Sequence, residues 1–280
     1  MSRSAPIFIG GLFKSGTSLL RAMLGQHPNI AAGLETYWFD LDWDARQSDE
    51  FAAKVERLRR YFDISPANMA RIVDASAGVY DFLDSLMSEF ARAQGKSRWC
   101  EKTPGNIYHL DRIVEGWPQA KIIHVVREPL DVLASIKEAK RHDWAAAFPD
   151  MWCRFVAGGI GQAKELGLDG GSYTEIRYES LILHPADTMK KVIAFIGEPW
   201  DPAVAQFSGR DDDFARVLAV TGKSSTTLAR LREPLQDSRL GIWRSLVSSE
   251  EADALRGEIV RRGHGPLFDL IRSQNPENTA

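Results

Sequence analysis

The feature that most constrains this chain is a glycine-rich stretch near its start, IFIGGLFKSGTSLL at residues 7–20. Its apolar first half, Ile7–Phe13, is typical of a short buried strand, and the segment Ser18–Gln26 is compatible with a helix. A strand, a glycine turn and a helix start in this order bring unpaired backbone N–H groups to the positive end of a helix dipole. The stretch therefore predicts an α/β fold with an anion cradle after its first strand.

The spacing of the stretch nearly matches the P-loop of nucleoside triphosphate enzymes, G-x-x-x-x-G-K-[ST]. Gly11 and Gly16 occupy the two glycine positions, but Thr17 stands where the P-loop has its lysine, and the lysine comes three residues earlier as Lys14. A kinase or NTPase also needs an acidic residue for magnesium at the end of a second strand. The displaced lysine favours a different anionic ligand, with a P-loop-like kinase or NTPase as the alternative.

Further short apolar strands are predicted along the chain, and helical patterns separate them. The clearest are Lys121–Val126 and Ser172–Arg177, and weaker ones lie at Asn29–Ala32 and Ser97–Glu101. Strands that alternate with helices form parallel sheets covered on both faces. We therefore expect a P-loop-like, three-layer α/β fold with a central, mainly parallel sheet flanked by helices. The helices after the first are expected at Asp49–Phe62, Val79–Ala93, Pro129–Glu138, Trp152–Leu166, Pro185–Ile196 and Ser249–Arg262.

The composition excludes several classes of partner. The formal net charge is −3, which gives no general attraction to nucleic acid. No stretch approaches the roughly 20 apolar residues that a membrane helix needs, and no secretory signal precedes the first strand. Cys100 and Cys153 lack metal-ligand spacing and suit reduced thiols of a cytoplasmic protein.

A second motif follows the strand Lys121–Val126. Arg127 comes directly after the strand, at the end where open α/β sheets bind ligands, and Ser135 follows eight residues later in a predicted helix. The planar guanidinium fork binds phosphate oxygens in pairs, and a hydroxyl can add a further hydrogen bond. This pair is suited to a terminal phosphate rather than to a metal.

The glycine loop and the spacing of Arg127 and Ser135 together resemble the two nucleotide-binding motifs of sulfotransferases, which use 3′-phosphoadenosine 5′-phosphosulfate (PAPS). The resemblance extends through Arg177–Leu181 and Phe195–Gly197, so that it covers about residues 5–200. It implies metal-independent, in-line transfer of a sulfuryl group from PAPS to a hydroxyl acceptor, which is a glycan, lipid, small molecule or peptide. A catalytically inactive nucleotide-binding relative is a further alternative.

The resemblance also implies an organisation of the chain. Residues 1–280 form a single sulfotransferase domain, with a nucleotide-binding core at 5–200 and a helical insertion on the acceptor side at about 37–95. Residues 200–272 form a C-terminal helical or lid region. Within it, the segment Asp211–Gly241 has no clean period and is expected to be a long loop.

The same resemblance implies roles for the donor-binding residues. Lys14 is expected on the sulfuryl group and the leaving oxygen, and Arg127 with Ser135 on the 3′-phosphate that distinguishes PAPS from ATP. Lys102, within Glu-Lys-Thr-Pro, is expected to position the acceptor and stabilise developing charge. Tyr178 is expected either on the nucleotide or packed in the core. The 5′-phosphate is assigned to Ser15, Gly16, Thr17 and Ser18. A loop that covers the nucleotide is expected in the run Gly222–Thr227, with Lys223, Ser224 and Ser225 as its binding residues, or in the later run Ser238–Trp243.

The general base has two candidates. Glu35 lies in a Gly-x-Glu-Thr segment that resembles the one carrying the base in tyrosylprotein sulfotransferases and related bacterial proteins. Small-molecule sulfotransferases instead use a histidine just after a Lys-Thr pair, and here the first histidine after that pair is His109. The segments Tyr37–Trp43 and Arg141–Trp144 are rich in aromatic residues, which suit either an acceptor pocket or the core.

Overall fold

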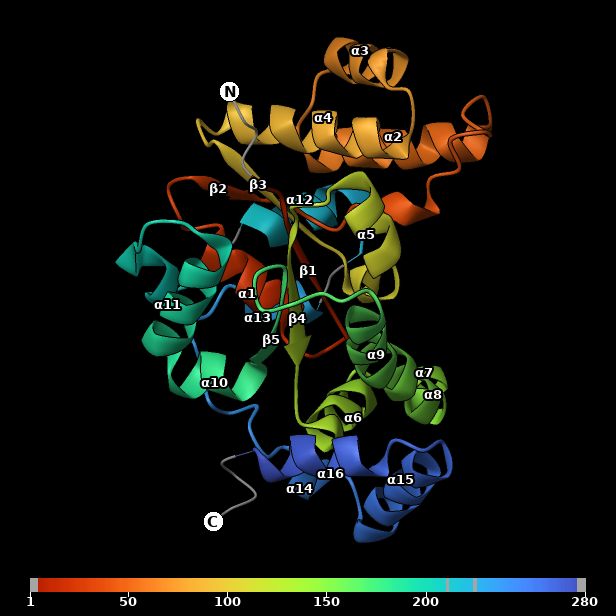
Figure 1. Ribbon diagram of the computed structural model, residues 1–280, viewed down its shortest axis with the longest axis vertical. Helices are drawn as coiled ribbons and strands as arrows, with labels where there is room; N and C mark the ends of the chain where they lie inside the picture. The colour runs from red at the N-terminus through yellow and green to blue at the C-terminus, as the bar shows by residue number, and fades with distance from the viewer. Residues whose placement is uncertain (1–4, 210–211, 224–225, 276–280) are drawn as a thin grey trace.

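The computed structural model describes residues 5–209, 212–223 and 226–275. Its centre is a five-stranded sheet in the order β2-β3-β1-β4-β5, in which every pairing is parallel (Figure 1). The parallel sheet expected from the sequence is confirmed, including the two strands with the weaker patterns. The strands are β1 (Ile7–Gly11), β2 (Ile30–Ala32), β3 (Arg98–Lys102), β4 (Lys121–Val126) and β5 (Tyr173–Arg177).

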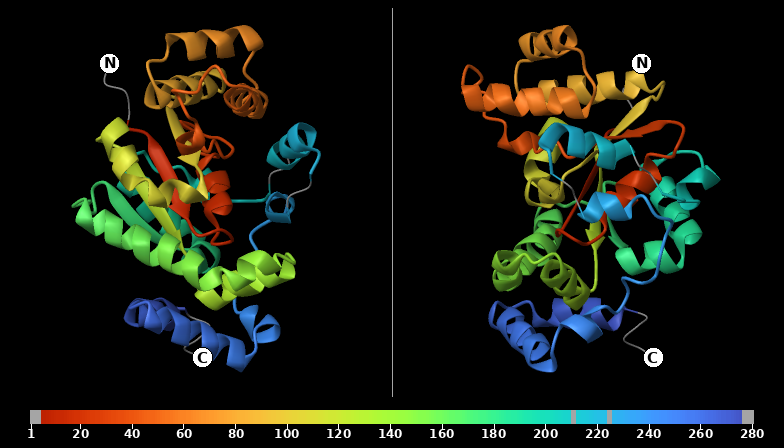
Figure 2. Two further views of the ribbon diagram at one scale, coloured as in Figure 1. Left: turned by 90° about the vertical axis from the view of Figure 1, so that its right-hand side faces the viewer. Right: turned by 180° about the vertical axis from the view of Figure 1, so that it is seen from behind.

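The sheet separates two hydrophobic cores, which confirms the three-layer arrangement (Figure 2). Successive side chains of β1 alternate between them: Ile7 and Ile9 face one core and Phe8 the other, all fully buried. The first core is covered by α1 (Thr17–Leu24), α10 (Tyr178–Leu183) and α11 (Pro185–Ile196). The second is covered by α4 (Val79–Ala93), α5 (Leu110–Gly116), α6 (Pro129–Glu138) and α9 (Gly158–Glu165).

The strand register brings the predicted site residues to one edge of the sheet. Ile9 of β1 is level with Lys102, the last residue of β3, and Gly11 is level with Val125 of β4. Because all strands are parallel, the glycine loop, Lys102 and Arg127 leave the sheet at the same end. The fold therefore assembles at one place three segments that are far apart in the sequence.

A helical unit lies between β2 and β3 and extends from one end of the molecule (Figure 1). Its helix α2 (Asp49–Tyr61) begins at Ser48, whose hydroxyl accepts a hydrogen bond from the amide of Phe51. The helix α3 (Pro66–Ala75), with proline in its first turn, was not predicted from the sequence. The unit places α2 beside the cavity described below, because Arg57 and Tyr61 line it.

The prediction of a long loop over Asp211–Gly241 was wrong, because the segment contains α12 (Asp212–Thr221) and α13 (Thr226–Arg230). The helix α12 is held by contacts with α2: Arg216 donates to the carbonyl of Tyr61, and Arg60 donates to the carbonyl of Ala219. These contacts join residues more than 150 positions apart, so the local sequence pattern carries little of the signal for this helix.

The last helices pack beside α6 at the opposite end from the helical unit (Figure 1). The helix α15 (Ser249–Arg261) begins with a capping box between Ser248 and Glu251. Within the described part of the chain, no helix is both long and apolar enough to cross a membrane. The remaining elements are α7 (His142–Ala146), α8 (Phe148–Trp152), α14 (Trp243–Leu246), α15 (Ser249–Arg261), α16 (Gly265–Ser273) and the short turns η1 (Trp38–Asp40), η2 (Pro104–Tyr108), η3 (Cys153–Ala157) and η4 (Pro202–Ala205).

Candidate active site

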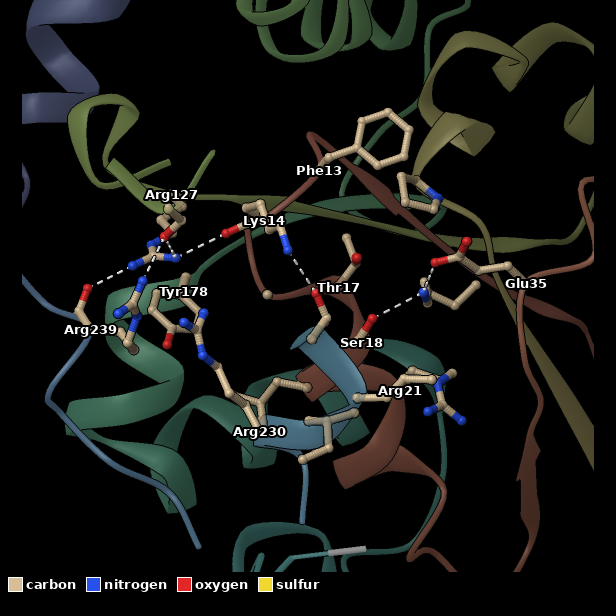
Figure 3. A pocket seen from close by; sticks show the side chains of 18 of the residues that line it. Phe13, Lys14, Thr17, Ser18, Arg21, Glu35, Arg127, Tyr178, Arg230 and Arg239 are labelled. Atoms are coloured by element: carbon tan, nitrogen blue, oxygen red, sulfur yellow. Dashed lines mark hydrogen bonds and ion pairs between the residues drawn. The ribbon is translucent and has the colours of Figure 1, made fainter. Parts of the chain in front are cut away.

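A cavity of about 750 Å³ lies at the carboxyl edge of the sheet (Figure 3). Its walls come from the glycine loop and α1, from residues 34–37 and α2, and from the segment between Phe207 and Arg239. Lys102 and Arg127, at the ends of β3 and β4, also line it. The cavity therefore unites the two sequence motifs with the segment that was expected to be a loop.

The glycine loop requires its glycines for space as well as for backbone conformation. Gly11 has a φ of +146°, and a Cβ there would lie 2.4 Å from the carbonyl oxygen of Val125. Gly16 has a φ of +97°, and its Cβ would lie 2.3 Å from the ring of Tyr178. Gly16 precedes α1, whose first turn has no acidic residue. The first N–H groups of α1 therefore have the geometry that favours an anion, and the cradle itself stays a prediction.

Lys14 adds a side-chain cation to this cradle. Its backbone has a φ of +69°, and its ammonium group donates to the hydroxyl of Thr227 at 3.1 Å. Burial, and after it the charges of Arg230 and Arg239, lower the pKa of the Lys14 amine. Because Lys14 lies among guanidinium groups, this part of the cavity carries positive charge, which favours an anion.

Arg127 and Ser135 lie together, as predicted, and Arg239 joins them. Arg127 donates to the carbonyl of Lys14 at 2.9 Å and to the carbonyl of Arg239 at 2.6 Å. The hydroxyl of Ser135 accepts from Arg127 at 3.4 Å and from Arg239 at 3.2 Å. The Nε atoms of both arginines are buried without a hydrogen-bond partner among the described residues. Two converging guanidinium groups with donors to spare fit a doubly charged phosphate.

Tyr178 is buried and also reaches the cavity. It is 7% exposed, and its ring packs against Gly16 and 4.3 Å from the guanidinium carbon of Arg127. It also lines the cavity. The packing against Arg127 is established, and contact of Tyr178 with the nucleotide stays a prediction.

Glu35 and Lys102 form an ion pair at another wall of the cavity. The ammonium group of Lys102 donates to Oε1 of Glu35 and, at 3.1 Å, to the hydroxyl of Ser18 in α1. Oε2 of Glu35 accepts a hydrogen bond from the Tyr37 hydroxyl at 2.5 Å. Burial alone would raise the pKa of Glu35, but the charge and hydrogen bond of Lys102, together with the Tyr37 hydroxyl, lower it below its ordinary 4.5. Glu35 is therefore an ionised carboxylate next to the anion cradle.

A buried carboxylate, Glu101, holds this wall in place. It is fully buried at the end of β3, and burial raises its pKa. It accepts from the amide and hydroxyl of Thr36 at 3.2 and 2.8 Å, and from the hydroxyl of Thr103 at 2.6 Å. Asn106 donates to it at 2.5 Å and also to the carbonyl of Ile9 in β1 at 3.0 Å. These hydrogen bonds connect Thr36, which follows Glu35, to Glu101, which precedes Lys102.

The histidines lie elsewhere. His109 is not among the residues that line the cavity; its ring packs 4.2 Å from that of Phe39, and burial lowers its pKa. His27 is bonded to the carbonyl of Pro199 at 2.9 Å, and His124 is fully buried beside the hydroxyl of Tyr173. All three make structural contacts.

The aromatic segments are divided between the core and the cavity. Trp38 is fully buried in the core, whereas Tyr37 lines the cavity together with Phe13 and Trp144. Of the expected covering loop, Lys223 is exposed and outside the cavity lining, and Ser224 and Ser225 lie outside the described residues. The part of that region that reaches the cavity begins instead at Thr227.

Several cavity residues were missed from the sequence. They are mainly arginines from helices: Arg21, Arg57 and Arg230. Arg21 is 1% exposed and pairs with Asp213 of α12 at 2.5 Å. No sequence motif predicts that these residues line the cavity, because their positions depend on packing between distant elements. Among the described residues, no group of three or more His, Cys, Asp or Glu side chains is placed to hold a metal ion.

Known proteins share both the sequence and the fold. The chain matches the Sulfotransferase family over residues 6–202. It is 27% identical over 210 residues to the protein-tyrosine sulfotransferase of Drosophila melanogaster, a match that covers 71% of this chain and 39% of that protein. It is 26% identical over 269 residues to the nodulation protein NoeE of Sinorhizobium fredii, with 87% and 61% covered. The chain spans about half the length of the curated relatives it matches.

Solved structures agree on the fold. The sulfotransferase domain from the Synechococcus PCC 7002 olefin synthase has a TM-score of 0.65 and 21% identity, with 91% of this chain and 95% of that one covered. The sulfotransferase domain from the curacin biosynthetic pathway has a TM-score of 0.68 and 16% identity, with 91% and 97% covered. The resemblance seen in the glycine loop and in Arg127 and Ser135 is confirmed, and this chain belongs to the sulfotransferase family.

Proposed function

We propose that this protein transfers a sulfuryl group from PAPS to a hydroxyl group of an acceptor. The observation that carries the proposal is that one cavity holds two anion-binding places and an ionised carboxylate. The first place is the cluster of Arg127, Ser135 and Arg239, and the second is the cradle of the glycine loop and Lys14. When bound, PAPS supplies the activated sulfuryl group on its 5′-phosphate and a separate 3′-phosphate, and these anions match the two places in charge.

Each donor-binding residue has a role that its surroundings support. The N–H groups at the start of α1 and the side chains of Ser15, Thr17 and Ser18 bind the 5′-phosphate. Lys14 stabilises the charge that develops on the leaving oxygen. Arg127, Ser135 and Arg239 bind the 3′-phosphate through the guanidinium donors that lack a partner in their cluster. A role for Lys223, Ser224 and Ser225 stays a prediction.

Glu35 is the proposed general base. Its lowered pKa keeps it ionised at neutral pH, so it can align an acceptor hydroxyl and take its proton. Lys102 lies between Glu35 and Ser18 and thus links the base to the cradle. His109, the other candidate from the sequence, lies outside the cavity lining, and this supports Glu35.

The acceptor side is lined by Phe13, Tyr37, Tyr61 and Trp144, with Arg57 between the two tyrosines. Aromatic walls suit phenol or sugar rings, so a hydroxyl of a small molecule, glycan, lipid or peptide is the proposed acceptor. The names of the relatives, protein-tyrosine sulfotransferases among them, support a hydroxyl acceptor. Action in the cytoplasm stays a prediction.

The proposal is tested by incubating the protein with sulfur-35-labelled PAPS and a panel of phenols, sugars, lipids and peptides. We expect label transfer to at least one class of hydroxyl acceptor, and its loss in a Glu35→Gln variant that still binds 3′-phosphoadenosine 5′-phosphate (PAP). Binding of PAP without transfer to any acceptor would show an inactive relative. Binding of magnesium ATP in preference to PAP would show a kinase or NTPase.

A further inference from the structure

We propose that Tyr37 is a positioning residue for the reaction: its hydroxyl fixes the Glu35 carboxylate in the orientation in which it receives the acceptor's proton. This inference rests on the proposed function in one respect, namely that Glu35 is the base. The motifs did not assign a role to Tyr37, which lies in the segment that the sequence left divided between acceptor pocket and core.

Both oxygens of the Glu35 carboxylate are held, each by a different side chain. Lys102 donates to Oε1, and the Tyr37 hydroxyl donates to Oε2 at 2.5 Å. Lys102 is in turn bonded to Ser18 of α1. A carboxylate held at both oxygens keeps its plane fixed, and since each oxygen has about two acceptor sites, one on each stays available for a hydroxyl. Tyr37 and Lys102 thus orient the Glu35 carboxylate and still leave acceptor sites on it for the hydroxyl of the acceptor.

The backbone of Tyr37 is strained in a way that serves this contact. Its φ is +52°, a left-handed conformation that aromatic residues seldom adopt. Its amide donates to the hydroxyl of Thr103 at 3.3 Å, and Thr103 is bonded to the buried Glu101. Such strain persists where the surroundings over-determine it, and functional sites are where it gathers. Here the strained residue ends in a hydroxyl on the candidate base.

The ring of Tyr37 is also fixed on its other side. The guanidinium carbon of Arg57 lies 5.5 Å from the centre of the ring, and Arg57 donates to the carbonyl of Thr36 at 3.1 Å. The same guanidinium lies 5.9 Å from the ring of Tyr61, which also lines the cavity. No hydrogen bond joins the Tyr61 hydroxyl to Glu35 among the described residues, so Tyr61 is a matched control for Tyr37.

The other charged and titratable groups that face Glu35 come from three elements. Lys102 faces it from β3, Arg21 from α1, and Tyr61 from α2, where Arg57 donates to the carbonyl of the neighbouring Thr36. None of these is altered by replacing Tyr37 with phenylalanine, which keeps the ring and removes only the hydroxyl. The substitution therefore isolates the hydrogen bond to Oε2.

The test is a pH titration of Glu35 by NMR on the full chain with carbon-13-labelled glutamate side chains, in the presence of PAP. The signal is assigned by its loss in Glu35→Gln. We expect Tyr37→Phe to raise the titration midpoint of Glu35 by about one pH unit, since a hydrogen bond to the charged form is lost. Tyr61→Phe leaves the midpoint unchanged. With an acceptor from the screen, Tyr37→Phe lowers kcat about tenfold at an unchanged KM for PAPS.

Two results would overturn the inference. One is an unmoved Glu35 titration in Tyr37→Phe, which would leave Tyr37 with a packing role only. The other is a higher kcat in that variant, which would mean that the hydroxyl competes with the acceptor for Glu35. Because Glu35 titrates whether or not PAP binds, failure of the wild type to bind PAP would contradict the proposed function and not the role of Tyr37.

Discussion

The donor end and the acceptor end of the cavity are built in different ways. At the donor end, one short stretch contributes both the glycine loop and the start of α1, and Arg127 comes directly after β4. At the acceptor end, the position of Glu35 depends on side chains from distant segments, among them Lys102 and Glu101. The difference teaches that short local patterns specify the glycine loop and Arg127, whereas the position of Arg239 and the orientation of the base depend on tertiary structure.

The largest effect on turnover is expected from replacing the base, because this change alters the acceptor end of the cavity and leaves the donor end intact. Glu35→Gln should lower kcat by about 10²–10⁴-fold, the range of general-base catalysis, because the amide cannot accept the acceptor's proton. The donor end should be unaffected, so PAP affinity measured by calorimetry should stay close to that of the wild type. Equal turnover of the variant and the wild type would remove Glu35 from the mechanism.

The pH dependence of kcat/KM in the wild type also tests whether Glu35 is ionised. Because the pKa of Glu35 is lowered, the carboxylate stays ionised as the pH falls to the ordinary value of 4.5, and kcat/KM should fall only below it. A fall that is already complete between pH 6 and 7 would contradict an ionised, paired Glu35.

The next effect concerns the charge at the donor end. Lys14→Met should lower kcat by about 10²–10³-fold, since removal of one preorganised group from the developing charge costs about 2.7–4 kcal/mol in comparable sites. Lys14→Arg, which keeps the charge, should recover part of the loss. Kinetics with saturating PAPS measure both, and an equal loss in the two variants would show that charge is not what Lys14 contributes.

A smaller effect is expected from the network behind the acceptor end. In Glu101→Gln, one carboxylate oxygen is replaced by an NH₂ group, which cannot accept the hydrogen bonds that the neighbouring side chains donate. The lost hydrogen bonds should lower the free energy of unfolding by about 1–3 kcal/mol. Urea unfolding measures the cost, with Glu175→Gln, an exposed glutamate on the edge strand β5, as the comparison. A Glu101 variant as stable as the wild type would mean that the acceptor end is held by other contacts.

The sequence was sufficient to predict that the glycine loop and Arg127 lie together, because both follow the ends of parallel strands. A parallel strand delivers whatever follows it to the carboxyl edge of the sheet, so Arg127 and the glycine loop could be placed from short patterns. The sheet itself was predictable for the same reason, since its strands are short apolar runs between helical patterns. The order of the strands came only from the structure.

The rest could not be read from the sequence because it depends on contacts between distant residues. Arg239 reaches Arg127 from 112 residues further along the chain, in a segment without a regular period. The helix α12 was missed because its stabilising partners lie on α2. The hydrogen bond from Tyr37 to Glu35 spans two residues, yet it depends on a strained backbone that no propensity predicts.

The most direct test of the account is whether Arg127 distinguishes nucleotides by their 3′-phosphate. Calorimetry would compare PAP with 5′-AMP in the wild type and in Arg127→Lys, which keeps the charge and loses the planar fork. We predict that the wild type binds PAP about tenfold to a hundredfold more tightly than 5′-AMP, as charge-assisted hydrogen bonds provide, and that most of this preference is lost in the variant. Equal affinity of the wild type for the two nucleotides, or an undiminished preference in Arg127→Lys, would contradict the account.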